Sequence, residues 1–304
     1  MAKPVVVIHG GAWSVPDEWV PATVSGVKQA ARIGYEVLRK GGSALDAVES
    51  AVRYLEDNEA FNAGRGSSLN LAGDAVMECS IQRGSDLKAG CASLLTDVQN
   101  PVSLARAIME NCPHAFLSGD GARDYAISQG VSLTTPDYFV TEAAKKELQQ
   151  FFRDTRSGEN RKDTVGAVAL DGAGHVASAT STGGTVGKYV GRVGDAPLIG
   201  GGTYADDFVG AVSCTGHGES ILKYCLSHTI ITLMSAGFSC EEATRKAVTG
   251  MTERVANTGG AIAVSNKGDV GHYCTTKRMS WAYVKDGQMH FGIQPNQHDV
   301  EDYV

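Results

Sequence analysis

The sequence lacks the short motifs that identify several large enzyme classes. It contains no G-x-x-x-x-G-K-[ST] phosphate loop, no H-E-x-x-H zinc motif and no G-x-S-x-G nucleophile turn. The glycine clusters at 200–202 and 216–218 do not match G-x-G-x-x-G after a strand. These absences remove the sequence support for P-loop, metalloprotease and esterase functions, and a dinucleotide cofactor is not expected.

Long apolar runs and paired cysteines are also missing. No run approaches the ~18 apolar residues of a membrane span, and the N-terminus lacks the apolar stretch of a signal peptide. The seven cysteines form no C-x-x-C pair and no zinc-type spacing, so we expect reduced, buried thiols. The net charge of −7 disfavours nucleic acid as a partner. We therefore expect a cytoplasmic protein that binds neither a membrane nor a nucleic acid.

The residues that are present indicate one large α+β domain. The chain has 304 residues, of which 42% are hydrophobic, so a sizeable core can form. Strands and helices fall in two blocks rather than in strict alternation, which favours a layered αββα sandwich. Strands are expected at 5–8, 75–82, 90–96, 164–170, 173–179, 197–200, 211–214, 261–264, 270–274 and in a hairpin about 286–287. Helices are expected at 24–39, 44–55, 101–111, 121–129, 141–152, 219–235 and 241–256.

The composition changes abruptly in the middle of the chain. The segment 153–163 contains no aliphatic or aromatic residue, and the small apolar run 164–170 follows at once. Thr164 is therefore the first residue after a solvated linker. A threonine becomes a good nucleophile when it begins a chain, because its α-amine, with a pKa of about 7.7–8.0, can act as general base. That role requires a cut before Thr164; the alternative is an ordinary structural threonine at the start of a strand.

Nine short segments, spread over nearly the whole chain, occur in an order that matches a known family. They are Val7–Gly11, Gly41–Val48, Leu55–Asp57, Phe61–Gly64, Asp163–Val168, Ser181–Gly184, Gly191–Asp195, Thr215–Ser220 and Phe291–Ile293. In these segments the sequence resembles the isoaspartyl peptidase/L-asparaginase family, the plant-type asparaginases. The members are N-terminal-nucleophile hydrolases that mature by self-cleavage. The resemblance implies a four-layer αββα sandwich over residues 1–304, cleaved into 1–163 and 164–304, and a homodimer of such pairs.

The resemblance also implies which residues are catalytic. Thr164 is the implied nucleophile, first for cleavage of the Asp163–Thr164 bond and then for turnover. Its hydroxyl would attack the preceding carbonyl to give an ester that water opens. The other implied catalytic residues are Thr182, which hydrogen-bonds the nucleophile, Thr215 and Gly216, which form the oxyanion hole, and Asn62, which positions the freed amine.

Two charged residues account for the implied substrate. Arg192 suits a free α-carboxylate through its bidentate fork, and Asp195 suits a free α-ammonium. Gly218 would line the same pocket. The expected activity is hydrolysis of L-asparagine to aspartate and ammonia, and cleavage of isoaspartyl dipeptides. The alternative for Arg192 and Asp195 is a surface ion pair at i,i+3, and His217, next to Thr215, is interpreted as structural.

A sodium site is implied by the same resemblance, in the loop 55–65. Its ligands would be the main-chain carbonyls of Leu55, Glu56, Asn58, Phe61, Ala63 and Arg65. Hard oxygen ligands suit such a cation. The alternative is a loop held by its own hydrogen bonds. No cofactor is expected for catalysis.

Three of the departures from the family's usual pattern bear on the expected function. Where relatives usually have Met-Asp-Ala-Ser-Ile-Met-Asp-Gly, this chain has Glu78 in place of the first aspartate and Arg83 in place of the second. Asp163 stands where many asparaginases have glycine and where the glycosylasparaginase branch has aspartate. Two alternative functions therefore stay open, a glycosylasparaginase and an uncleaved, non-catalytic scaffold.

Overall fold

The structure is a computed structural model of the chain and describes residues 2–153 and 163–303. Most of the predicted linker, 154–162, lies outside the described residues. The helices are α1 (Val20–Arg39), α2 (Ala44–Glu56), α3 (Pro101–Asn111), α4 (Gly119–Ser128), α5 (Glu142–Arg153), α6 (Gly218–Tyr224), α7 (Leu226–Ser235) and α8 (Cys240–Val255), with short 3-10 turns η1 (Asp17–Trp19), η2 (Gly64–Gly66) and η3 (Pro136–Phe139). The strands are β1 (Val5–Trp13), β2 (Met77–Arg83), β3 (Ala89–Leu95), β4 (Phe116–Ser118), β5 (Val165–Leu170), β6 (Val176–Thr182), β7 (Thr203–Asp206), β8 (Gly210–Gly216), β9 (Gly259–Ser265), β10 (Val270–Cys274), β11 (Arg278–Lys285), β12 (Gln288–Gly292) and β13 (Asp299–Asp302).

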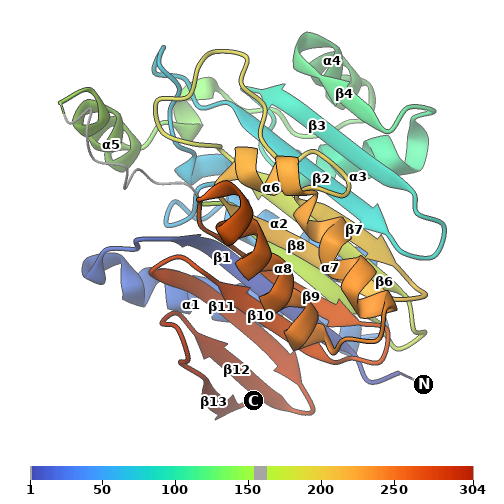
Figure 1. Cartoon of the computed structure of the whole chain (residues 1–304). Helices are drawn as coiled ribbons and strands as arrows, with labels where there is room; N and C mark the ends of the chain where they lie inside the picture. Colours follow the sequence, from blue (N-terminus) through green and yellow to red (C-terminus); the bar gives the residue numbers. More distant parts are fainter. Residues whose placement is uncertain (1, 154–162, 304) are drawn as a thin grey trace.

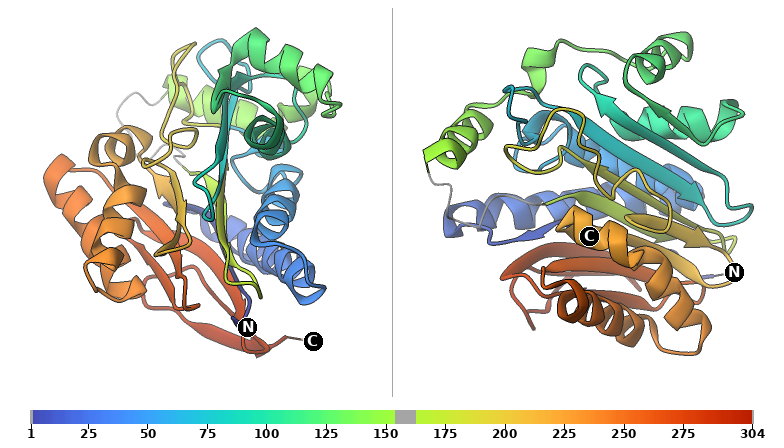
Figure 2. Two further views of the ribbon diagram at one scale, coloured as in Figure 1. Left: turned by 90° about the vertical axis from the view of Figure 1, so that its right-hand side faces the viewer. Right: turned by 45° about the horizontal axis from the view of Figure 1, so that its top comes forward.

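Two sheets face each other, and helices cover their outer faces (Figures 1 and 2). The larger sheet has the strand order β13-β12-β11-β1-β5-β6-β2-β3-β4, and the smaller has β10-β9-β8-β7. Helices α1, α2 and α3 pack on the larger sheet, whereas α7 and α8 pack on the smaller one. The layers thus follow one another as helices, sheet, sheet and helices, and the predicted α+β class is confirmed.

Strand β1 is buried on both faces, which explains its uninterrupted apolar run. Because side chains alternate along a strand, Val6 and Ile8 enter the core under the helices, while Val5 and Val7 enter the core between the sheets. The next side chain on the inter-sheet face is His9, which is fully buried. It interrupts the apolar inter-sheet core, to which Ala12, farther along β1, again belongs.

Next to His9 the two sheets meet through polar side chains. His9 Nε2 lies 2.9 Å from Ser213 Oγ, which in turn lies 2.7 Å from Thr180 Oγ1. Ser80 Oγ donates to Thr203 Oγ1 at 2.8 Å. Burial lowers the pKa of His9 to about 3, so its ring is neutral and can share hydrogen bonds with hydroxyls. This polar cluster adjoins the candidate site, since Thr180 precedes Thr182 on β6 by two residues.

Helix starts follow local sequence signals. Ser43 and Asp46 form the predicted capping box at the start of α2, and Pro101 begins α3 at the predicted residue. Helix α1 has one buried face and one polar face. In the described ranges, no helix is both long enough and apolar enough to cross a membrane.

Two predicted elements are wrong. The helix expected at 219–235 is divided into α6 and α7, because Cys225 adopts a left-handed conformation with φ of 50°. The strand expected at 197–200 is a turn with one bridge, Ile199 to Thr203, and the ladder strand β7 begins only at 203. The strands β4 and β13 were not anticipated, since each is short and carries mostly exposed side chains.

Glu56, the last residue of α2, is a buried carboxyl that joins three elements. Its Oε1 accepts hydrogen bonds from Ser181 Oγ on β6 at 2.6 Å and from the backbone N of Val102 on α3 at 3.0 Å. Burial raises the pKa of Glu56 to about 8, although these hydrogen bonds oppose the rise. The protonated form is therefore the one that the fold favours.

We predict that Glu56→Gln reduces the loss of stability between pH 5 and pH 8. The folded pKa lies above the ordinary value of 4.5, so the stabilisation is complete below about pH 4.5 and is lost as the pH rises through about 8. The glutamine keeps an acceptor oxygen and cannot ionise. Urea unfolding at pH 5 and pH 8 should show a wild-type loss about 2–4 kcal/mol larger than that of the variant.

The matched control is Glu253→Gln on the exposed surface of α8, which should follow the wild type at both pH values. Equal losses in wild type and Glu56→Gln would contradict the assignment of a protonated Glu56.

Candidate active site

Thr164 lies immediately before β5, in the middle of the larger sheet, and only 4% of it is exposed. Val165 pairs with Ser181 of the neighbouring strand β6, which places Thr164 opposite Thr182. Thr164 Oγ1 donates to Thr182 Oγ1 at 3.2 Å. The structure therefore brings these two predicted site residues into contact.

The carbonyl oxygen of Asp163, which belongs to the peptide bond before Thr164, accepts two hydrogen bonds. Asn62 Nδ2 donates to it at 2.8 Å and Thr182 Oγ1 at 3.0 Å. Since Thr182 has a single hydroxyl hydrogen and uses it here, the Thr164 hydroxyl is the donor of the Thr164–Thr182 contact. Two donors on one carbonyl polarise it and would stabilise negative charge on its oxygen.

Both donors are held in place by backbone groups. Asn62 Oδ1 accepts from the backbone N of Ser68 at 2.7 Å, and its Nδ2 also donates to the carbonyl of Gly184 at 2.6 Å. The backbone N of Gly184 donates to Thr182 Oγ1 at 2.9 Å. The 182–184 turn thereby fixes the amide and the hydroxyl relative to each other. Asn62 thus contacts the carbonyl of the bond before Thr164.

The end of β1 connects Asp163 with Thr215. Gly11 has a φ of 111°, and a Cβ on it would lie 2.4 Å from Asp163 Cβ, so only glycine fits there. The next residue, Ala12, donates its backbone N–H to Thr215 Oγ1 at 3.1 Å. Thr215 and Gly216 end β8 in the opposite sheet. Strand β1 thus contacts the Asp163–Thr164 side through Gly11 and the predicted oxyanion hole through Ala12.

Arg192 and Asp195 both lie beside the backbone of Gly218. A Cβ on Gly218 would lie 2.7 Å from Arg192 Nη2 and 2.8 Å from Asp195 Oδ1. Burial raises the pKa of Asp195 to about 7, against the opposing effect of the Arg192 charge. The Arg192 side chain is only 14% exposed. These two residues are therefore not a surface ion pair; they present a cation and an acid at one enclosed place.

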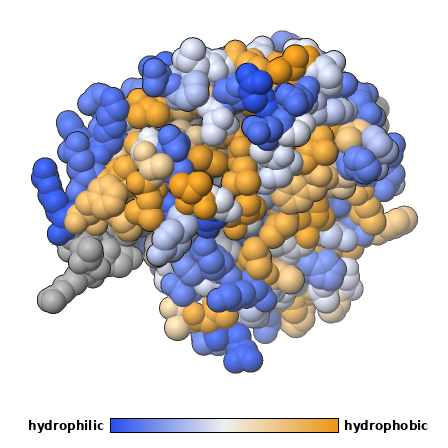
Figure 3. Space-filling view, turned by 90° about the horizontal axis from the view of Figure 1, so that it is seen from above, coloured by the Kyte–Doolittle hydropathy of each residue, from blue (hydrophilic) through white to orange (hydrophobic). Residues whose placement is uncertain are grey.

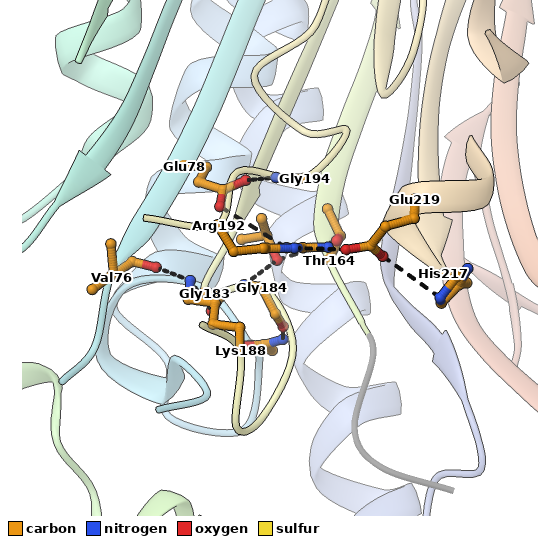
Figure 4. A network of polar contacts seen from close by, with 12 residues as sticks. Val76, Glu78, Thr164, Gly183, Gly184, Lys188, Arg192, Gly194, His217 and Glu219 are labelled. Carbon is orange, nitrogen blue, oxygen red and sulfur yellow. Dashed lines mark hydrogen bonds and ion pairs between the residues drawn. The ribbon is translucent and has the colours of Figure 1, made fainter. Parts of the chain in front are cut away.

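Sequence reasoning missed Lys188 and Glu219 as members of the site (Figure 4). Lys188 is 5% exposed and donates to the carbonyl of Gly183 at 2.9 Å. Glu219 Oε1 accepts from Arg192 Nε at 2.9 Å. The available signal was a lysine inside the glycine-rich stretch 183–194 and a glutamate at the end of the Thr215–Ser220 motif.

The remaining residues singled out from the sequence have plain structural surroundings. His217 Nδ1 lies 2.7 Å from Ser220 Oγ, and its Nε2 lies 3.5 Å from Glu219 Oε2. Arg83 lies at the opposite end of β2 from Glu78 and forms two hydrogen bonds with Asp86, at 3.0 and 2.7 Å. The arginine that replaces the usual acid at position 83 is therefore neutralised by Asp86 in the β2–β3 turn.

The loop 55–65 curls around two glycines. A Cβ on Gly64 would lie 2.2 Å from the carbonyl oxygen of Glu56, and one on Gly66 would lie 1.9 Å from that of Phe61. Backbone hydrogen bonds from residues 58, 61 and 66 engage the carbonyls of Leu55, Asn58 and Ala63. A second lone pair remains on each such oxygen. Within the described ranges, no group of three or more His, Cys, Asp or Glu side chains could hold a metal ion, so main-chain carbonyls are the candidate ligands.

Comparison with known proteins identifies relatives over the full chain. A family model described as asparaginase matches residues 2–293. The isoaspartyl peptidase/L-asparaginase of Homo sapiens is 46% identical over 307 residues, which cover 99% of each chain. That of Xenopus laevis is 45% identical and covers 98% of this chain and 97% of its own. The probable isoaspartyl peptidase/L-asparaginase of Drosophila melanogaster is 42% identical and covers 97% and 96%.

Proposed function

The chain belongs to the asparaginase family, and on that premise we propose that it hydrolyses L-asparagine to aspartate and ammonia and cleaves isoaspartyl dipeptides. The observation that carries the proposal is the placement of both Arg192 and Asp195 beside Gly218. This pair complements a free α-carboxylate and a free α-ammonium on one aspartyl unit. When both groups are bound, the side-chain carbonyl is the part of the substrate left to react.

The first step of the proposal is cleavage of the Asp163–Thr164 bond. Thr164 Oγ attacks the Asp163 carbonyl carbon, and the charge that develops on the oxygen is stabilised by Asn62 Nδ2 and Thr182 Oγ1. The hydroxyl proton passes to the departing amide nitrogen, which leaves an ester between Asp163 and Thr164. Water then hydrolyses the ester and releases the Asp163 carboxylate and a free α-amine on Thr164.

The second step is turnover by the new N-terminal threonine. Its α-amine accepts the hydroxyl proton while Thr164 Oγ attacks the side-chain carbonyl of the substrate. Thr215 accepts a hydrogen bond from Ala12, so its own hydroxyl hydrogen is available to an oxyanion, beside the N–H of Gly216. Ammonia or the second amino acid leaves with that proton, and water opens the acyl-enzyme.

The sheet order supports a cleaved but undivided domain. Strands from 1–163 and from 164–304 are interleaved in the larger sheet: β1 lies between β11 and β5, and β2 lies next to β6. The halves therefore share one set of backbone hydrogen bonds after cleavage. This arrangement supports the four-layer N-terminal-nucleophile hydrolase fold.

A dimer of cleaved pairs and a structural sodium ion are further parts of the proposal. Tyr189 and Val190, in the loop that carries Arg192, are 78% and 70% exposed. Apolar surface is also visible among hydrophilic surface on the upper face (Figure 3), and a second copy would remove it from water. Main-chain carbonyls of the 55–65 loop would hold the sodium ion. Those of Glu56 and Phe61 pack against Gly64 and Gly66, and the bound ion would stabilise the loop around Asn62.

The substrate assignment is tested with three compounds and the purified protein. We expect ammonia from L-asparagine and free aspartate from an isoaspartyl dipeptide, but no cleavage of the corresponding α-linked aspartyl dipeptide. Release of sugar amine from a glycosylated asparagine, in preference to these reactions, would instead support glycosylasparaginase. No turnover of any of them by the processed protein would contradict the proposal and leave the scaffold alternative.

The cleavage mechanism predicts that Asn62→Ala slows self-cleavage by about 10²–10³-fold, since one of two donors to the Asp163 carbonyl is lost. Disappearance of the full-length chain over time, followed on a denaturing gel, measures this rate. Asn111→Ala, at the exposed end of α3, is the control and should cleave like the wild type. An Asn62→Ala variant that cleaves at the wild-type rate would remove Asn62 from the mechanism.

The raised pKa of Asp195 predicts a pH-dependent KM. Below about pH 7 its carboxyl is largely protonated in the empty site and binds an ammonium group poorly, so KM for L-asparagine should rise about tenfold per pH unit below 7. Asp195→Asn should raise KM by about 10²-fold or more and abolish this dependence. Steady-state kinetics between pH 5.5 and 8.5 measures both effects. A KM that stays constant over this range in the wild type would contradict the role of Asp195.

A further inference from the structure

Arg192 lies between two carboxylates of different exposure (Figure 4). Glu219, at the start of α6, has a 44% exposed side chain and contacts Arg192 Nε at 2.9 Å. Glu78, at the start of β2, has a completely buried side chain, and its Oε1 lies 3.9 Å from Arg192 Nη1. One carboxylate therefore approaches the guanidinium from the surface and the other from the interior.

Glu78 also holds the backbone on which the guanidinium rests. Its Oε2 accepts a hydrogen bond from the backbone N of Gly194 at 2.7 Å. A Cβ on Gly194 would lie 2.7 Å from Arg192 Nη1, so the guanidinium lies directly against this glycine. A single side chain thus controls the turn that carries Arg192 and faces the charge that Arg192 bears.

The strand register connects Glu78 to the reacting end of the site. Glu78 on β2 is the direct cross-strand partner of Thr182 on β6, the residue that contacts Thr164. The distance between the carboxylate-binding end of the pocket and the nucleophile is therefore determined across one pair of adjacent strands.

Lys188 provides the charge that makes a buried carboxylate tolerable at this place. Burial raises the pKa of Glu78, and the charges of Lys188 and Arg192 oppose the rise. Lys188 donates to the carbonyls of Val76, two residues before Glu78, and of Gly183, which follows Thr182. It therefore links the start of β2 to the end of β6, next to the carboxylate.

Glu78 Oε1 is buried and has no hydrogen-bond partner within the described part of the chain. A buried carboxylate oxygen without a hydrogen bond destabilises the fold unless a nearby opposite charge compensates its own charge. Its nearest cationic contact is Arg192, which points to an electrostatic task rather than a packing one.

We propose that Glu78, supported by Lys188, is a positioning residue that orients Arg192 for the α-carboxylate of the substrate. The proposal rests on the proposed function and adds a residue that controls how tightly the aspartyl unit binds. Glu219 occupies Nε of Arg192. The terminal nitrogens Nη1 and Nη2 therefore remain for the substrate, and Glu78 orients them toward the pocket. Self-cleavage involves no free α-carboxylate and does not depend on this arrangement.

The test compares Glu78→Gln and Glu78→Asp with the wild type. The glutamine keeps an acceptor for Gly194 but loses the charge, whereas the aspartate keeps the charge with a shorter reach. We expect Glu78→Gln to raise KM for L-asparagine about tenfold, with kcat within about threefold of the wild type and an unchanged rate of self-cleavage. Glu78→Asp should lie closer to the wild type than Glu78→Gln. Arg83→Gln, at the other end of the same strand, is the control and should match the wild type.

Binding of L-aspartate, measured by isothermal titration calorimetry, gives a readout that needs no turnover. We expect its Kd to rise about tenfold in Glu78→Gln and to stay unchanged in Arg83→Gln. An unchanged KM and Kd in Glu78→Gln would overturn the positioning role while leaving the proposed function intact. A joint fall of kcat, self-cleavage and thermal midpoint would instead assign Glu78 a merely structural role. A wild type that neither binds aspartate nor hydrolyses asparagine would refute the proposed function itself, and with it the positioning role.

Discussion

The two hydrogen bonds to the Asp163 carbonyl are the interaction on which the site depends. They require that Asn62, from the loop after α2, and Thr182, from the end of β6, approach the same peptide oxygen. Glycines make the approach possible, because a Cβ on Gly11 would displace the Asp163 side chain and a Cβ on Gly183 would displace that of Asn62. The Thr164 hydroxyl then lies beside a carbonyl that is already prepared to carry negative charge.

The layer between the two sheets contains both apolar core residues and a cluster of polar residues. Between the sheets, valines from β1 and β5 belong to an apolar core, while His9 and the hydroxyls of Thr180 and Ser213 form a hydrogen-bonded polar cluster beside it. Buried hydroxyls without partners would destabilise the domain, but here each finds one in the facing sheet. A polar site can therefore be buried in the sandwich without loss of the apolar core.

Local signals were sufficient for elements whose ends are marked in the sequence, such as the Ser43 capping box and Pro101 at the start of α3. They could not reveal the break at Cys225, since a positive φ at a non-glycine residue results from tertiary packing. Local signals also could not show that Thr164 contacts Thr182; these two positions were named together only through the family resemblance. The sequence alone did not place Lys188 and Glu219 in the site, because most lysines and glutamates lie on the surface. Only the spatial neighbours of these two residues show their contacts with the site.

The most direct test of the account is the intact mass of the purified protein under denaturing conditions, with the first residue of each fragment determined. Division of the 31.9 kDa chain at the Asp163–Thr164 bond predicts fragments of about 17 and about 15 kDa. The smaller fragment should begin with Thr164, as an N-terminal nucleophile requires. A single chain that persists through long incubation, or a fragment that begins at any other residue, would contradict the assignment of Thr164.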